Sequence, residues 1–305
     1  MNKELPQSFL VKEEKIKKVL EVLSQYEVVF KGGTSLSLSH GIIKRFSEDI
    51  DVSFYLEDKN DTKINRKNIK EEIVADLKKL DWIETIELNG TDILISFQNN
   101  AEVSKLNSVI RPNTIKLELQ DPERKRHKPI SSNIAPFEGA HFTMNVANSF
   151  STYTDKVALL VELTYSNEIG ILIDKAKTMP RHMYDYLAIY EHLDAGRAIS
   201  SQKKYVEYCN KRIDINVVKN VEGKIVPRTK YDNIFWSKNI LKQKSMFPIF
   251  ASFLKMHKET IIEIINSIVH PGASKFSIAK FLKAIESNFK YYEGLMFAKL
   301  NNIFG

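Results

Sequence analysis

The sequence lacks most of the residue patterns that identify common enzyme classes. It has a single cysteine, Cys209, which excludes an internal disulfide and fits a reducing cytoplasm. Its seven histidines do not have the spacing of a zinc site. Neither the glycine–lysine loop of P-loop proteins nor the glycine fingerprint of dinucleotide-binding proteins is present. These absences argue against zinc-dependent, P-loop and Rossmann-type chemistry.

Long hydrophobic runs are also missing. No apolar stretch approaches the roughly 20 residues that a membrane-spanning helix needs. The segment from Met1 to Glu4 has mixed charge and does not resemble the start of a signal peptide. We therefore expect a cytoplasmic protein without a membrane partner.

The chain does contain enough apolar residues for two domains. It has 305 residues, of which 43% are hydrophobic and 27% are charged. Helix and strand patterns alternate as far as residue 150, and the pattern after residue 151 is mainly helical. We expect an α/β (α+β) N-terminal domain with a small mixed sheet over residues 1–150. A mainly α-helical C-terminal domain is expected over residues 151–305.

Hydrophobic periodicity predicts the individual elements. Helices are expected at 11–25, just after residue 34, and at 68–80, 153–165, 181–194, 200–212, 246–268, 275–290 and 295–304. Strands are expected at 27–30, 49–54, 82–88, 92–97, 114–119 and 141–147. Asn89-Gly90 is a strong hairpin turn signal. Residues 57–68 are expected to be a loop, and residues 220–228 a loop or a small hairpin.

The segment that begins at Phe30 is the most informative part of the chain. A short strand leads into Gly32 and Gly33, which let a ligand approach the backbone closely. Thr34 is expected to cap a short helix, whose free N–H groups can bind an anion. An ordinary strand-to-helix turn would have the same sequence, so this segment alone does not decide between the two.

Two aspartates follow on a predicted strand. Asp49 and Asp51 are two positions apart, and the period of a strand places both on one face. Two carboxylates so close repel each other unless a cation lies between them. Oxygen ligands suit Mg²⁺, which binds one or two carboxylates together with substrate phosphates. A phosphate-binding turn beside such a pair is what nucleotidyl transfer needs; the alternative is a solvated strand face.

The segments Gly32 to Leu36 and Arg45 to Asp51 resemble the signature of the AbiEii/AbiGii toxin-type nucleotidyltransferases, of the DNA polymerase β-like superfamily. The superfamily is marked by a Gly-Ser/Thr turn followed by Asp-x-Asp. The resemblance extends from residue 28 to about residue 190. It implies transfer of a nucleoside monophosphate from an NTP to an acceptor hydroxyl. The implied nucleotide-binding residues are Gly32, Gly33, Thr34, Ser35 and Lys156, and the implied ligands of Mg²⁺ or Mn²⁺ are Asp49 and Asp51.

Two further residues follow from the resemblance. Sites of this superfamily carry a third carboxylate on a neighbouring strand, for which Glu118 is the candidate. A solvent-side pair of Glu118 with Lys116 is the alternative. Lys156 resembles the family's lysine near the start of a helix and would bind the triphosphate as a point charge. The alternative for Lys156 is an ordinary surface lysine.

The fourth family motif corresponds to residues 181–186. Arg181, Tyr184 and Asp185 match the motif, while His182 replaces an acid and Tyr186 an aliphatic residue. By resemblance, Asp185 is the functional residue of this segment. Because Arg181 and Asp185 are four positions apart, an intrahelical ion pair is the alternative.

The net charge of +7 favours a polyanionic partner. Basic clusters with neighbouring aromatic residues suit RNA, although lysine enrichment of the whole genome would produce similar clusters. The clusters are 124–128, 203–204, 211–212 and the group Lys238, Lys242 and Lys244. The resemblance implies a tRNA 3′ end as acceptor and a cognate antitoxin as partner.

Three hypotheses therefore remain from the sequence. The first is a metal-dependent nucleotidyltransferase in which Asp49, Asp51, Glu118, Lys156 and Asp185 are catalytic. In this hypothesis, a cleft between the domains brings the helical residues opposite the aspartates. The second is a nucleotide- or RNA-binding module of the same fold without chemistry, and the third is a phosphotransferase that uses the same site.

Overall fold

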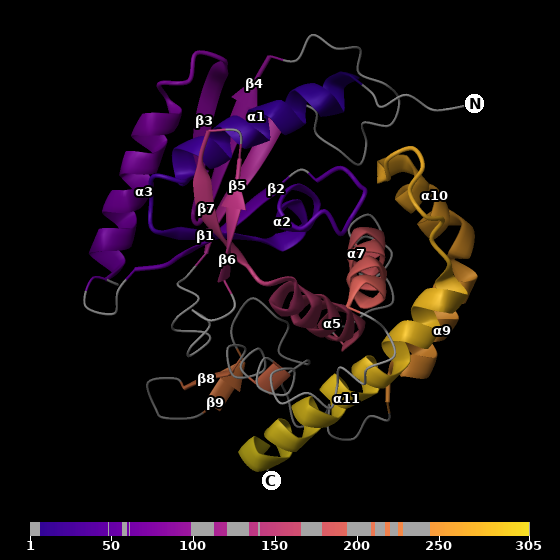
Figure 1. Cartoon of the computed structure of the whole chain (residues 1–305). Coiled ribbons are helices and arrows are strands. Elements are labelled where there is room, and N and C mark those ends of the chain that lie inside the picture. Colours follow the sequence, from indigo (N-terminus) through magenta and orange to yellow (C-terminus); the bar gives the residue numbers. More distant parts are fainter. Residues whose placement is uncertain are drawn as a thin grey trace. The chain divides into compact units, whose positions relative to one another are not determined.

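The computed structural model describes residues 7–47, 49–56, 60, 62–98, 113–120, 134–139, 141–165, 179–193, 209–210, 217–219, 225–227 and 245–304 (Figure 1). The chain divides into two compact units. The first comprises residues 1–152 and 268–273, and the second comprises residues 153–267 and 274–305. The domain boundary near residue 150 and the functional division of the two domains stay predictions.

The first unit contains a seven-stranded mixed sheet with the order β3-β4-β5-β2-β1-β7-β6. The strands are β1 (Val28–Lys31), β2 (Asp49–Phe54), β3 (Ile83–Asn89), β4 (Asp92–Phe97), β5 (Thr114–Gln120), β6 (Ile134–Glu138) and β7 (Thr143–Ala147). Strands β2 and β5 are parallel, as are β1 and β7, and the other neighbours are antiparallel. The predicted α/β class with a mixed sheet is confirmed.

Three helices precede or interrupt the sheet in sequence: α1 (Gln7–Leu23), α2 (Gly32–Leu38) and α3 (Lys63–Leu77). Apolar side chains of α1 and α3 form one core with the inward-facing residues of the strands. On β2, Ile50 and Val52 are completely buried in this core. Asp49 and Asp51, at the alternate positions, are half-buried on the other face. Removing the apolar face from water thus fixes which face carries the carboxylates.

Two predictions for the first unit were wrong in detail. The helix expected at 68–80 begins at Lys63, because the Thr62 side chain caps it by accepting a hydrogen bond from the Asn65 N–H (3.1 Å). The sequence pattern also missed β6. This strand contains Pro136 and lies at an edge of the sheet, where a missing N–H is tolerated. The Asn89-Gly90 hairpin is confirmed, with Gly90 at φ +58°.

The described part of the second unit is helical apart from one hairpin. Its helices are α5 (Ser149–Tyr165), which begins in the first unit, α7 (Met179–His192), α9 (Phe247–Met256), α10 (Lys258–Ile268) and α11 (Ile278–Phe304). Strands β8 (Val217–Lys219) and β9 (Ile225–Pro227) form the hairpin that was one of two expectations for residues 220–228.

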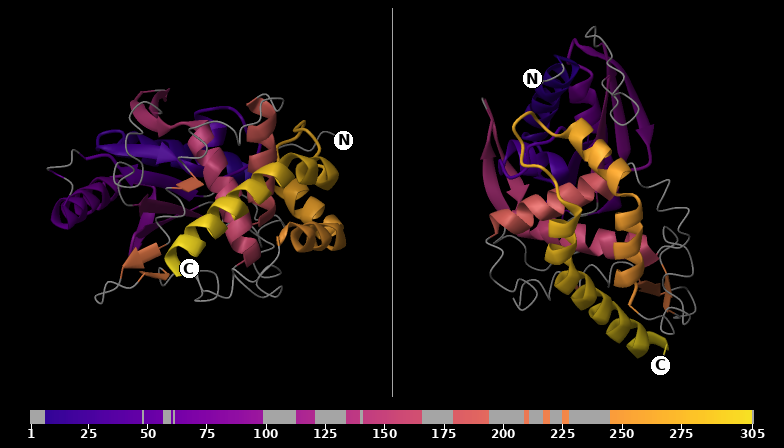
Figure 2. Two further views of the ribbon diagram at one scale, coloured as in Figure 1. Left: turned by 90° about the horizontal axis from the view of Figure 1, so that it is seen from below. Right: turned by 90° about the vertical axis from the view of Figure 1, so that its right-hand side faces the viewer.

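Two helix predictions for this unit need correction. The single helix expected at 246–268 is two helices, because α9 ends at its C-cap His257 before α10 starts. The two helices expected at 275–290 and 295–304 are one continuous helix, α11 (Figure 2). Most of the helix expected at 200–212 lies outside the described residues. Among the helices that the structure describes, none is both long enough and apolar enough to span a membrane.

Candidate active site

The glycine turn and the second aspartate lie against each other. Strands β1 and β2 are antiparallel, and Lys31 is the register partner of Asp51. Gly32 follows directly and has φ +76°, a conformation that side-chain-bearing residues rarely adopt. A Cβ atom on Gly32 would lie 2.8 Å from Cγ of Asp51 and would overlap its carboxylate. Glycine is therefore required here both by the backbone and by the neighbouring aspartate.

The hydroxyl groups of the turn bond to the protein itself. Helix α2 begins at Gly32 with Lys31 as its N-cap, so the prediction that Thr34 caps the helix was wrong. Thr34 is buried, and its Oγ1 lies within hydrogen-bond distance of Ser47 Oγ (2.6 Å) and of the Asp49 carbonyl oxygen. Ser35 donates to the Gly32 carbonyl oxygen (2.9 Å). These bonds attach α2 to the start of β2 and so position Asp49; phosphate binding by Thr34 and Ser35 stays a prediction.

Glu118 lies beside the aspartate pair. In the parallel register of β2 and β5, Asp51 is the partner of Glu118 and Asp49 is the partner of Lys116. Cross-strand partners project on the same face of a sheet. The structure thus places Glu118 on the strand next to the aspartate pair, while its role as a third acid stays a prediction.

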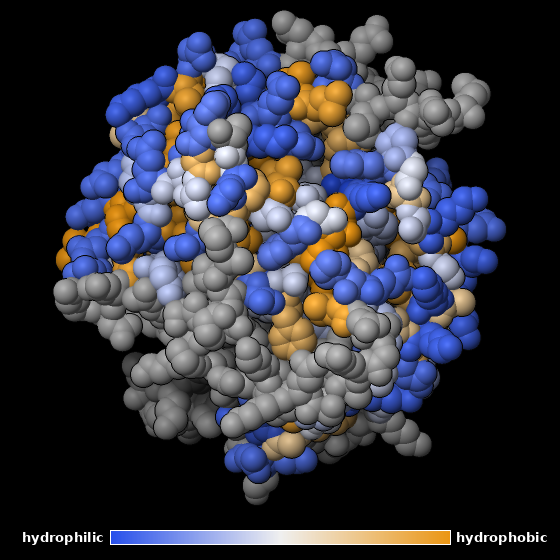
Figure 3. Space-filling model, viewed as in Figure 1, coloured by the Kyte–Doolittle hydropathy of each residue, from blue (hydrophilic) through white to orange (hydrophobic). Residues whose placement is uncertain are grey.

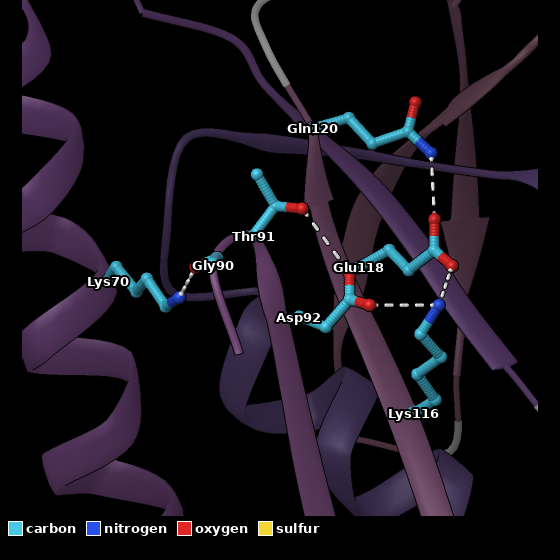
Figure 4. A network of polar contacts seen from close by, with 7 residues as sticks. All are labelled: Lys70, Gly90, Thr91, Asp92, Lys116, Glu118 and Gln120. Carbon is cyan, nitrogen blue, oxygen red and sulfur yellow. Dashed lines mark hydrogen bonds and ion pairs between the residues drawn. The ribbon is translucent and has the colours of Figure 1, made fainter. Parts of the chain in front are cut away.

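Sequence analysis missed a fourth carboxylate in this row, Asp92 on β4. Asp92 is the register partner of Glu118. The Lys116 Nζ lies 3.0 Å from Asp92 Oδ2 and also contacts Glu118 Oε1, while Gln120 donates to Glu118 Oε2 (3.3 Å; Figure 4). Burial lowers the pKa of Lys116, but its hydrogen bonds to the two carboxylates raise that pKa above the ordinary value overall. The sequence did contain a clue to Asp92, because it is the first residue of the second strand of the predicted hairpin.

The donor atoms of the aspartate pair suit a hard divalent cation. Asp49 and Asp51 offer only carboxylate oxygens, and the strand period places both on one face. Within the described ranges, no three His, Cys, Asp or Glu side chains are grouped closely enough to hold a metal ion. Mg²⁺ usually takes only one or two protein carboxylates and completes its shell with phosphates and water. The residues therefore fit a two-carboxylate site.

In the second unit, the structure brings Lys156 and Asp185 together. Lys156 on α5 is 8% exposed, and Asp185 on α7 is fully buried. The Lys156 Nζ lies 3.0 Å from Asp185 Oδ2 and 3.2 Å from His182 Nδ1. The alternative of an ordinary surface lysine is therefore wrong. His182, which replaces the acid of the family motif, accepts from the ammonium only if Nδ1 carries no proton.

The basic clusters proposed for RNA lie outside the described residues. These clusters are residues 124–128, 203–204 and 211–212 and the group Lys238, Lys242 and Lys244. RNA binding by these clusters stays a prediction.

Proteins similar to this chain were found among solved structures and family models. A search of curated proteins found no match. The structure of JHP933 from Helicobacter pylori aligns over 98% of this chain and 99% of its own, with 14% identity and a TM-score of 0.45. A second Helicobacter pylori structure, of a candidate nucleotidyltransferase, aligns over 95% and 99%, with 15% identity and a TM-score of 0.44. An antigenic nucleotidyltransferase-like protein from Paracoccidioides brasiliensis aligns over 67% and 89%, with 13% identity and a TM-score of 0.41.

The family evidence comes from the sequence profile described as "Nucleotidyl transferase AbiEii toxin, Type IV TA system", which matches residues 20–271. This range includes the glycine turn, both aspartates and the Lys156–Asp185 pair. Because the match spans well over half of the sequence, the chain belongs to the AbiEii family of nucleotidyl transferase toxins.

Proposed function

We propose that this protein transfers a nucleoside monophosphate from an NTP to an acceptor hydroxyl and releases pyrophosphate. The observation that carries the proposal is the position of Asp51. Its carboxylate lies against the Gly32 backbone, shares a strand face with Asp49 and has Glu118 as its cross-strand partner. The proposed phosphate-binding turn, the proposed metal ligands and a further acid thus lie beside one another within one unit.

Asp49 and Asp51 are the proposed ligands of Mg²⁺ or Mn²⁺. Bound there, the ion would neutralise charge on the triphosphate and stabilise the attacking and leaving oxygens of an in-line displacement. The role of the two side chains is to fix where the triphosphate lies. Gly32 and Gly33 have no side chains and therefore let the phosphates approach the backbone.

Glu118 is the proposed acceptor for the proton of the attacking hydroxyl. Lys116 and Gln120 each hold one of its oxygens, which restricts its rotamer. A carboxylate has about four lone-pair positions, so it can accept a further bond from the acceptor. Lys116 thus acts as a positioning residue for Glu118.

Lys156 is the proposed contact to the triphosphate. An ammonium group has three N–H donors, and the contacts to Asp185 and His182 use two of them. The third can donate to a phosphate oxygen, while Asp185 holds the ammonium in one place. This assignment is tested by nucleotide affinity.

The proposed acceptor is the 3′ end of RNA, with tRNA as the first candidate, and the proposed protein partner is an antitoxin. The net charge of +7 supports a polyanionic acceptor. The family membership supports the toxin role and, with it, the antitoxin.

The decisive experiment is incubation of the protein with each labelled NTP, total RNA, and Mg²⁺ or Mn²⁺. Label should enter RNA with one preferred nucleotide and only in the presence of the metal. Asp51→Asn should lower the rate at least about a hundredfold, because a bound metal contributes several kcal/mol to catalysis. Asp81→Asn, an equal charge change at an exposed position, is the control. Wild-type activity of folded Asp51→Asn would show that the site lies elsewhere.

A further inference from the structure

A groove of about 710 Å³ lies between α3 and the turn of the β3–β4 hairpin. Its apolar lining includes the side chains of Phe54, Val74 and Leu119, which belong to the core of the first unit. Five cationic side chains line the groove, against one carboxylate, Glu71. The cations are Lys63, Arg66, Lys67, Lys70 and Lys78. Because like charges repel, this concentration favours an anionic ligand.

The cations form a row instead of a single cluster. All five belong to α3 or its C-cap, and Lys63 and Lys78 are 15 positions apart, about 22 Å along a helix. Neighbours three or four positions apart are separated by roughly 5–6 Å. A single phosphate can contact only one or two members of such a row. A polymer with regularly repeated charges can contact most of it.

The groove lies near the end of β5 that carries Glu118. The Lys70 ammonium donates to the Gly90 carbonyl oxygen and thereby joins α3 to the hairpin turn (Figure 4). The carbonyl oxygen of Thr91, the next residue, accepts a hydrogen bond from the Leu119 N–H (3.1 Å). Leu119 lines the groove, while the preceding residue, Glu118, faces the other side of the sheet. The groove and Glu118 therefore lie at the same end of β5 but on opposite faces of the sheet.

We propose that this α3 groove binds the sugar–phosphate backbone of the acceptor RNA, and that the single strand continues past the end of β5 towards Glu118 on the other face of the sheet. The inference rests on the proposed function for the identity of the polymer. Hydrophilic side chains with hydrophobic patches between them cover the face of the first unit over α1 and α3 (Figure 3). Such a mixed surface suits a single strand, which presents both phosphates and bases.

The test is RNA affinity as a function of salt. The variant Arg66→Gln/Lys67→Gln/Lys78→Gln removes three charges and keeps Lys70, which holds the hairpin. The probes are a labelled single-stranded RNA oligonucleotide and a labelled tRNA transcript. The variant should bind at least about tenfold more weakly at low salt. The slope of log affinity against log salt should become shallower by about 2, since each lost phosphate contact to a single strand contributes about 0.7.

Two further variants make the test specific. Lys255→Gln/Lys258→Gln/Lys283→Gln removes the same charge from exposed helix positions of the second unit and should bind RNA like the wild type. Glu71→Gln removes the single carboxylate of the groove, which lies 3.7 Å from Lys67, and should strengthen binding a few-fold. A nonspecific effect of net charge would weaken binding equally in both triple variants.

The outcomes separate this inference from the proposed function. If the wild type transfers nucleotides but the groove variant binds RNA as tightly as the control, the α3 groove is not the RNA site and the activity stands. If no acceptor is labelled by the wild type but the groove variant loses RNA binding, the groove inference stands and the transferase proposal fails. A wild-type protein that does not bind either RNA probe overturns the groove inference.

Discussion

Gly32 is the residue at which backbone conformation and proposed chemistry depend on each other. Its φ of +76° costs an alanine about 1–2 kcal/mol, and a Cβ atom there would also overlap the Asp51 carboxylate. Gly32→Ala should therefore displace Asp51 and lower the rate of nucleotidyl transfer by at least about tenfold, with a modest loss of stability. Transfer rates and urea unfolding of the purified variant measure both effects.

Gly41 provides a matched control for this substitution. It has φ +62°, and a Cβ atom on it would meet nothing within 4 Å. Gly41→Ala should lose a similar amount of stability, about 1–2 kcal/mol, and keep its activity. Equal activity of the two variants would mean that Asp51 does not take part in the reaction.

The residues on the carboxylate face could largely be predicted because their placement depends on the period of a strand. Asp49 and Asp51 alternate with buried Ile50 and Val52, and this pattern is local. The role of Thr34 could not be predicted, because its hydroxyl bonds to the Asp49 carbonyl oxygen 15 positions away. A capping residue and a tertiary contact have the same sequence signal when only neighbours are considered.

At the scale of elements, the Lys156–Asp185 pair connects α5 to α7 inside the second unit. Removing one partner of a buried ion pair typically costs about 3–5 kcal/mol. Lys156→Met should therefore lower the free energy of unfolding by about that amount, because Asp185 is completely buried. Urea denaturation followed by circular dichroism measures the loss.

The double variant Lys156→Met/Asp185→Leu separates stability from function. With both charges replaced by apolar groups, most of the stability should return. If this folded protein binds the NTP more weakly than the wild type, the pair contributes to the nucleotide site. Unchanged stability of the single variant Lys156→Met would contradict the burial of the pair.

The helices and strands that could be predicted are those whose sequence signals lie within a few residues of the element itself. The Asn89-Gly90 turn specifies its hairpin because glycine adopts the positive φ that the turn needs. Strand β6 could not be predicted, because its pairing partner β7 and its edge position decide whether Pro136 is tolerated. The division of residues 246–268 into α9 and α10 likewise had no proline or glycine signal at His257.

At the scale of the whole molecule, the chain enters the first unit twice. Residues 268–273 lie between α10 and α11 in sequence but belong to the first unit. Val269 forms a β-bridge with Arg45, and the His270 N–H donates to the Lys44 carbonyl oxygen (2.9 Å). Ile268 completes a small apolar cluster with Phe9 and Phe46. Contacts between segments more than 200 residues apart have no local sequence signal, which is why a linear boundary near residue 150 did not anticipate them.

This returning segment should make stability depend on pH through His270. Its ring packs against Phe46 at 4.5 Å, and its Nε2 atom is buried without a hydrogen-bond partner among the residues that the structure describes. Burial lowers the pKa of His270; attraction to Glu13 opposes this shift, and repulsion from Lys44 adds to it. Because the unfolded state, with a pKa near 6.5, binds the proton at a higher pH than the folded state, stability should fall as the pH drops through and below about 6.5.

His270→Phe tests this dependence, because it keeps the aromatic contact and cannot take up a proton. Urea midpoints of the wild type should fall between about pH 7.5 and about pH 5.5, and those of His270→Phe should fall by a smaller amount over the same interval. His141→Gln, which removes an exposed histidine of the same unit, should retain the full wild-type fall. If His270→Phe loses as much stability as the wild type, His270 takes up its proton equally well in the folded and unfolded states. The acid sensitivity of the first unit would then arise from other groups, and the segment 268–273 would contribute through its backbone bonds and Ile268 alone.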